Sequence, residues 1–198
     1  MVVDVLDADA VALAVAAARP DIIIHQLTDL PSAPGTPGYP AAQEANRRLR
    51  IEGTANLMRA AQRAGVRRAI AQSIAFVYAP GEGTRSEEDP LDMAVEGVRQ
   101  QTVQGIAALE REVLGTPGIA GVVLRYGYLY GPDTWYAAPP KSPSVHVEAA
   151  AHGVARGKPW RRDLQHRRGR RRRVDRQGRA RPRLRSGVQD QLIGGVAT

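Results

Sequence analysis

Residues that can donate, accept or exchange protons follow each short apolar run of the sequence. They are Asp4, His25, Ser73 and the adjacent pair Arg125-Tyr126. Carboxylates and imidazoles transfer protons, a hydroxyl can hydrogen-bond a substrate oxygen, and a guanidinium can hold an anion. If the apolar runs are parallel strands, these residues meet at the edge of the sheet where open α/β proteins bind ligands. The spacing therefore predicts a ligand site at that edge.

Metal chemistry is not predicted for this sequence. It contains no cysteine and only four histidines, and no group of His, Asp and Glu has the spacing of a metal site. The acidic run Glu87-Glu88-Asp89 is typical of a solvated loop. We therefore expect neither a metal ion nor a disulfide.

The elements that must position these residues alternate along the chain. Short β-branched runs predict strands at residues 2–6, 21–25, 68–73, 119–125 and 145–147. Apolar periodicity predicts helices at residues 9–19, 44–64 and 92–114, the first capped by Asp7, and a further helix from about Glu148. Four prolines in residues 28–42 predict a loop without helix or sheet interior. The alternation predicts an α/β fold with a parallel sheet.

Composition and charge divide the chain into two parts. Residues 1–155 carry 13 basic and 17 acidic side chains, a balance of −4, whereas residues 156–198 carry 15 and 3, a balance of +12. No apolar run is long enough to span a membrane. The first residues lack the features of a signal peptide, so a cytoplasmic location is expected.

A series of short motifs occurs in a characteristic order. They are Asp4-Val5-Leu6-Asp7, His25-Gln26-Leu27-Thr28, Asn46 seven residues before Gly53-Thr54-Ala55-Asn56-Leu57, the stretch Ala64-Gly65-Val66-Arg67-Arg68, Ser73 before Val77-Tyr78, Leu124-Arg125 before Tyr130-Gly131-Pro132, and His146-Val147-Glu148. Together they resemble the NAD(P)-dependent epimerase/dehydratase family, the extended short-chain dehydrogenases/reductases. The resemblance covers roughly residues 2–155 and implies a Rossmann-like, doubly wound sheet.

The resemblance also implies roles for particular residues. The cofactor, NAD or NADP, would be bound by Asp4, Val5, His25, Gln26, Leu27 and Asn46. The substrate pocket would include Arg125, Tyr126, Tyr128 and His146. The substrate would be a sugar nucleotide or a similar carbonyl or hydroxyl compound.

Two parts of the family pattern are missing from this sequence. No Gly-x-x-Gly-x-x-Gly turn is present to receive a pyrophosphate. The family's catalytic Tyr, Lys and hydroxyl residue align with Thr102, Ile106 and Ile74. None of these three side chains can take those roles. The pattern is closer to the atypical branch of the family. Only Ser73 and Tyr126 stay as candidate catalytic residues.

The missing turn leads to an expectation about the whole chain. We expect an N-terminally truncated domain, residues 1–155, that lacks its first βαβ unit and exposes a sheet edge, through which it would self-associate. Such a domain is not expected to bind the cofactor well or to be active alone.

The tail at residues 156–198 contains 13 arginines within residues 161–185 and no apolar periodicity. It is predicted to be disordered or irregular. Three interpretations stay open: translation in another reading frame, a genuine disordered tail, and an arm that neutralises nucleic-acid phosphates.

Three functions follow from these patterns. The first is a fragment of an NAD(P)-dependent epimerase/dehydratase-type oxidoreductase, with a nucleotide cofactor and a small-molecule substrate as the partners of its parent. The second is a non-catalytic NAD(P)-fold sensor or scaffold. The third, less favoured, is nucleic-acid binding through the tail.

Overall fold

The computed structural model describes residues 1–29, 36–81, 83, 85–141, 143–156 and 196–197. The helices are α1 (Ala8–Ala18), α2 (Tyr39–Arg48), the π-helix η1 (Leu49–Gly53), α3 (Thr54–Arg63), the 3-10 turn η2 (Ala75–Val77), α4 (Val98–Gly115) and α5 (Val147–Arg156). The strands are β1 (Ile22–His25), β2 (Arg68–Ile74), β3 (Ala120–Tyr126), β4 (Tyr128–Tyr130), β5 (Ser144–His146) and β6 (Val196–Ala197).

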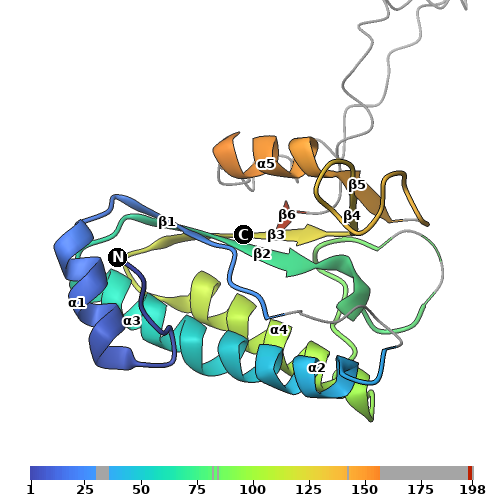
Figure 1. Cartoon of the computed structure of the whole chain (residues 1–198), viewed down its shortest axis with the longest axis horizontal. Coiled ribbons are helices and arrows are strands. Elements are labelled where there is room, and N and C mark those ends of the chain that lie inside the picture. Colours follow the sequence, from blue (N-terminus) through green and yellow to red (C-terminus); the bar gives the residue numbers. More distant parts are fainter. Residues whose placement is uncertain (30–35, 82, 84, 142, 157–195, 198) are drawn as a thin grey trace, which may run out of the picture.

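The main sheet has the strand order β1-β2-β3-β6, in which β1, β2 and β3 are parallel and β6 is antiparallel to β3. Helices α1 to α4 cover one face of this sheet and α5 covers the other (Figure 1). The predicted parallel, Rossmann-like α/β fold is confirmed. The predicted tail, apart from Arg156 at the end of α5 and from β6, lies outside the described residues.

The first helix and strand follow from local signals. The Asp7 carboxylate caps α1 by accepting hydrogen bonds from the Asp9 and Ala10 amides, and Val11 and Val15 are buried. Pro20 then stops the helix, and the β-branched run at Ile22 forms β1. The prediction of a helix capped by Asp7 is confirmed.

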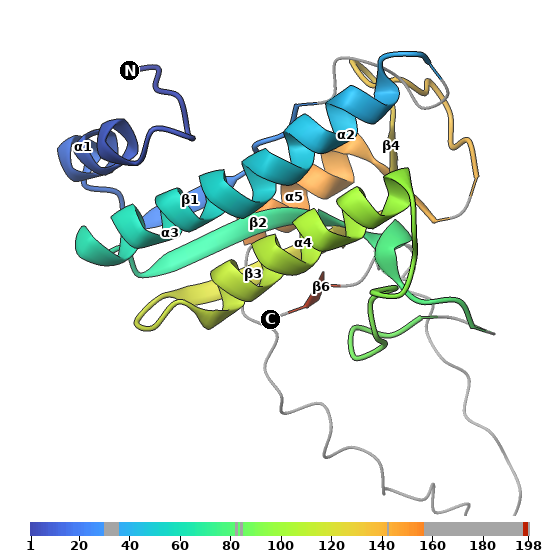
Figure 2. The ribbon, with the colours of Figure 1, turned by 90° about the horizontal axis from the view of Figure 1, so that it is seen from below.

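The predicted helix at residues 44–64 is wrong in two respects. It begins earlier, at Tyr39, because Pro40 occupies the first helical turn, where a missing N–H costs nothing. It is also interrupted by η1, where the Thr54 amide donates to the Leu49 carbonyl five residues back. Seen from below, α2, η1 and α3 form one continuous line beside α4 (Figure 2). The helix predicted at residues 92–114 begins only at Val98.

Residues 2–6 do not form the predicted strand. They are irregular, and the Asp4 carboxylate accepts a hydrogen bond of 2.9 Å from the Leu6 amide. No neighbouring strand pairs with them in the described part of the chain, and an unpaired strand leaves its backbone groups without partners. Strand β4, which the sequence did not predict, pairs in parallel with β5.

Strand β1 lies at an edge of the sheet. Among the described residues no strand pairs with its outer side, and Ile22 and Ile24 are 50% and 55% exposed. A hollow of about 410 Å³ lies beside this edge, between β1, α1 and the N-terminal segment. An apolar sheet edge with this exposure is a surface that favours association.

Candidate functional site

His25 ends β1 and is 2% exposed. The Leu27 amide donates to its Nδ1 at 3.3 Å, so Nε2 carries the proton and donates to the Thr54 hydroxyl at 2.8 Å. Burial, aided by the charge of Arg50, lowers the pKa of His25 to about 4. The imidazole is therefore neutral near pH 7 and links the end of β1 to the start of α3.

Asn46, on α2, is fully buried and only half satisfied. Its Oδ1 accepts hydrogen bonds from the Asp29 amide at 2.9 Å and from the Thr28 hydroxyl at 3.3 Å. Because the Asp29 amide can only donate, the oxygen must face it and Nδ2 must point the other way. Within the described residues, Nδ2 has no acceptor.

Arg50 belongs to η1, one turn beyond Asn46, and is 7% exposed. Its side chain packs against Gly105 of α4, where an added Cβ would lie 3.3 Å from the arginine Cδ. Burial lowers the pKa of Arg50 to about 10. The sequence does not single out this residue, because an arginine among Arg47, Arg48 and Glu52 is typical of a solvated helix face.

Ser73, Glu110 and Arg125 form a buried network between the sheet and α4. The Ser73 hydroxyl donates to Glu110 Oε1 at 2.6 Å, and Arg125 binds both oxygens of the same carboxylate. Arg125 also donates to the Tyr78 hydroxyl at 2.9 Å. A catalytic role for Ser73, or a substrate-binding role for Arg125, would require these bonds to break.

Tyr126 points to the opposite face of the sheet from Arg125, as neighbouring strand residues do. Its hydroxyl donates to the Ala150 carbonyl of α5 at 2.9 Å, and burial raises its pKa to about 12. A phenol with a raised pKa is a poor proton donor near neutrality. This geometry does not favour Tyr126 as an acid or base, and that role stays a prediction.

Tyr128 and His146, the remaining predicted pocket residues, lie in the small β4-β5 sheet. Tyr128 contacts Phe76 and Tyr136, with ring centroids 4.4 and 5.8 Å apart. His146 meets Tyr130 edge-on at 5.2 Å. The structure thus separates the four predicted pocket residues. Arg125 faces α4, Tyr126 faces α5, and the other two lie in aromatic pairs beyond the ends of β2 and β3.

Thr102 and Ile106 occupy the positions aligned with the catalytic dyad. The Thr102 hydroxyl donates to Gln43 Oε1 at 2.6 Å. Ile106 is fully buried and belongs to a small apolar cluster with Val77 and Val103. Neither side chain can supply the charge or the proton of a Tyr-Lys pair.

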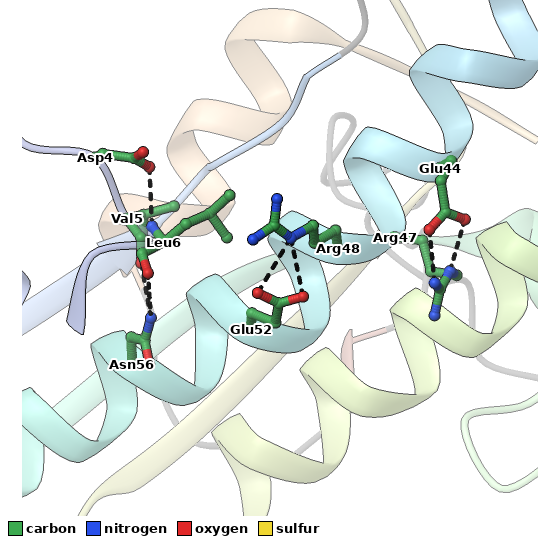
Figure 3. Close-up of polar contacts among 8 residues, drawn as sticks. All are labelled: Asp4, Val5, Leu6, Glu44, Arg47, Arg48, Glu52 and Asn56. Atoms are coloured by element: carbon green, nitrogen blue, oxygen red, sulfur yellow. Dashed lines mark hydrogen bonds and ion pairs between the residues drawn. The ribbon is translucent and has the colours of Figure 1, made fainter.

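The predicted cofactor residues of the N-terminal segment are tied to α3. Asn56 Nδ2 donates to the Val5 and Leu6 carbonyls at 3.1 and 3.3 Å (Figure 3). Val5 then lines the hollow beside β1, together with His25, Gln26 and Leu27. Four of the six predicted cofactor residues are thereby brought together, while Asn46 lies on α2 and the Asp4 carboxylate binds the Leu6 amide.

Across the described ranges, no three His, Asp or Glu side chains are grouped as metal ligands would be. No helix in those ranges has the length and apolar character needed to cross a membrane.

The parallel sheet, its two helical layers and the polar strand ends define an α/β protein of the Rossmann-like class. The NAD dependent epimerase/dehydratase family matches residues 1–173, and the chain belongs to this family of NAD(P)-binding oxidoreductases and their relatives. The family resemblance seen in the motifs is confirmed.

A reductase from a Streptomyces species is a close relative in sequence. The 3-diazoavenalumate denitrifying reductase is 49% identical over 139 residues, a match that covers 69% of this chain and 45% of the relative. The chain thus spans less than half the length of that relative.

Solved structures share the fold at low sequence identity. WbmH of Bordetella bronchiseptica, in complex with NAD+, has a TM-score of 0.58 at 16% identity, over 78% of this chain and 54% of that one. A GDP-L-fucose synthetase from Naegleria fowleri, bound to NADP, has a TM-score of 0.54 at 14% identity, over 66% of this chain and 41% of that one.

Proposed function

We propose that the chain is part of an NAD(P)H-dependent reductase that removes nitrogen from a diazo compound bearing a carboxylate. The observation that carries this proposal is the 49% identity over 139 residues to a reductase whose name describes such a reaction. The motifs alone implied a sugar nucleotide or a similar carbonyl or hydroxyl compound as the substrate. The similarity to this reductase favours a diazo compound instead.

The residues at the dyad positions support a reaction that needs no proton from the protein. Reduction of a carbonyl to an alcohol requires a proton at oxygen, which a positioned acid commonly supplies. Thr102 and Ile106 cannot supply one. A diazonium group instead accepts hydride at its outer nitrogen, and the resulting diazene loses dinitrogen as its hydrogen passes to carbon. The atoms balance without a protein acid.

A nicotinamide cofactor, when bound, would supply the hydride. The hollow beside β1, lined by Val5, His25, Gln26 and Leu27, has apolar walls with few polar groups, which suits part of a nucleotide. Because this sequence has no glycine-rich turn, we expect the 198-residue chain alone to bind the cofactor weakly and to be inactive.

A chimera tests the proposal apart from the completeness of the chain. The 139 matched residues of the Streptomyces reductase are replaced by those of this chain. We expect NAD(P)H oxidation and release of dinitrogen with a diazonium carboxylate, and no oxidation with a UDP-sugar. Turnover of the UDP-sugar alone would return the substrate to the sugar nucleotides.

The alternative function is a non-catalytic sensor or scaffold, which the dyad residues Thr102 and Ile106 also suit. It predicts that the chimera binds NAD(P)H, seen by quenching of cofactor fluorescence, but oxidises it with neither substrate. The arginine-rich tail lies outside the described residues, so its proposed nucleic-acid role has no structural support.

Self-association through β1 is supported by the exposure of Ile22 and Ile24. Sedimentation of the 198-residue chain is expected to show concentration-dependent dimers. An Ile24→Lys variant would place a charge on the free edge and shift the protein toward monomer. Equal sedimentation of both proteins would exclude this edge as the contact.

A further inference from the structure

Three neighbouring arginines of the α2-η1 segment have different surroundings. Arg47 binds Glu44 at 2.6 Å and Arg48 binds Glu52 at 3.0 Å (Figure 3). Arg50 is far more buried than either, yet no hydrogen bond or ion pair joins its guanidinium to any described residue. The Arg50 nitrogens are not among the fully buried polar atoms that lack a partner, so the guanidinium keeps contact with solvent, while burial of most of the side chain disfavours its charge.

The groups around Arg50 do not neutralise it. The titratable neighbours that share its electrostatic environment are Tyr39 and His25, and neither is a carboxylate. His25 is neutral near pH 7, and its one N–H is already donated to Thr54. The positive charge of Arg50 is therefore left without a counter-charge in the described part of the chain.

A second buried donor lies one helical turn away. Residues four apart on a helix share a face, so Asn46 and Arg50 point from the same side of α2-η1. Asn46 Nδ2 is also without an acceptor in the described residues, and the Asp29 amide fixes its orientation. A fully buried amide N–H and a charged guanidinium thus lie on the same side of this segment, and neither has an acceptor or counter-charge among the described residues.

The backbone that carries Arg50 is also unusual, because it forms a π-helical turn. Single π-helical turns inside α-helices are frequent at functional sites, and η1 carries Arg50. Gly105 of α4 leaves room for the arginine stem, since a Cβ there would lie 3.2 Å from the Arg47 Cα and 3.3 Å from Arg50 Cδ. The two helices thus accommodate a buried arginine that neither of them pairs.

We propose that Arg50 and Asn46 bind the carboxylate of a small-molecule ligand between α2-η1 and the carboxyl end of β1. A guanidinium fork and an amide N–H match the planar oxygens of a carboxylate. One carboxylate balances the single charge of Arg50, whereas a phosphate dianion would leave excess negative charge in a buried place. That this carboxylate belongs to the substrate rests on the proposed function. Binding of an anion at this place does not.

Anion binding by the 198-residue chain tests the proposal without cofactor or turnover. Thermal unfolding is followed with benzoate, inorganic phosphate or chloride at equal ionic strength. Benzoate is expected to raise the midpoint with the logarithm of its concentration. Arg50→Met should abolish this rise, and it should itself unfold at a midpoint no lower than the parent's without anion, because it removes a partly desolvated charge that has no ionic partner. Arg48→Met, which loses an equal charge from an exposed site, should respond as the parent does.

Three results would overturn the proposal: no benzoate effect beyond chloride, an equal rise in the Arg50→Met variant, or a rise with phosphate only. If Arg50→Met does not fold, NMR of the unmodified chain replaces the unfolding test. The Arg50 Nε–H resonance is identified as the signal that disappears in Arg50→Lys. That resonance should shift with benzoate and not with chloride, and an unmoved resonance would count against the site. Benzoate binding combined with an inactive chimera would reject the proposed function alone.

Discussion

Arg125 binds both carboxylate oxygens of Glu110, with 2.9 Å from Nε to Oε1 and 2.5 Å from Nη2 to Oε2, and each side chain is 7% exposed. The first residue lies near the end of β3 and the second lies on α4, so the pair fastens the helix to the sheet. Ser73 adds a third bond to the same carboxylate from β2. The pairing raises the pKa of Arg125 through its hydrogen bonds to Glu110.

Breaking this pair should be strongly destabilising. Glu110→Gln leaves the buried Arg125 without a counter-charge, and we expect a loss of about 3–5 kcal/mol in the free energy of unfolding by urea. The control is Asp21→Asn, which breaks a pair with Arg67 whose side chains are 76% and 79% exposed. That change should cost less than about 1 kcal/mol. Similar losses in both variants would contradict a special role for the buried pair.

His25 should make stability depend on pH. Its folded pKa of about 4 lies below the usual 6.5, so the unfolded chain binds more protons between these values. The contribution is complete above pH 6.5 and is lost as pH falls toward 4, on the order of 3 kcal/mol in total. Urea unfolding across this range should show the decline. His25→Gln should flatten it, whereas His152→Gln, which removes an exposed imidazole, should not.

Gly121 of β3 allows the strand to lie against α4. A Cβ there would lie 2.1 Å from the Val113 carbonyl oxygen, and backbone atoms cannot rotate aside. We expect Gly121→Ala to lower stability by roughly 1–3 kcal/mol. Gly115→Ala is the matched control, because a Cβ there meets nothing within 4 Å. Thermal unfolding of the two variants should differ, with the control unchanged or slightly more stable.

Tyr126 joins the sheet to α5 through its hydroxyl. Tyr126→Phe removes the bond to the Ala150 carbonyl, and we expect a loss of about 1 kcal/mol in urea unfolding. Tyr130→Phe is the control, since no described residue bonds that hydroxyl. In the unmodified chain one phenol should ionise only near pH 12, seen in the ultraviolet absorbance, and this late step should vanish in Tyr126→Phe. If the late ionisation persisted in Tyr126→Phe, another tyrosine would be responsible for it.

The fold was predictable where the signals are local. Asp7 before an apolar helical pattern and the β-branched run at Ile22 specify α1 and β1 within a few residues. The strand expected at residues 2–6 failed because strands form only with a neighbour. The start of α2 was missed because Pro40 stands at the one helical position that tolerates it.

The site was less predictable than the fold. The motifs identified the family and the strand-end residues, but not where their side chains point. Arg125 was expected in a pocket, and it is held by Glu110, a partner that local sequence could not indicate. The burial of Arg50 depends on the space left by Gly105, which lies far along the chain. Tertiary packing, which no short pattern contains, decides both.

The clamp formed by Ser73, Glu110 and Arg125 also bears on how this sequence can diverge. Removing one ionic partner leaves the other buried without a counter-charge. Replacing both with apolar residues of similar volume can leave the stability unchanged. Single substitutions at Glu110 or Arg125 should therefore be rare in natural variants. The two positions should covary across the family, and Ser73 should be free to change once the carboxylate has gone.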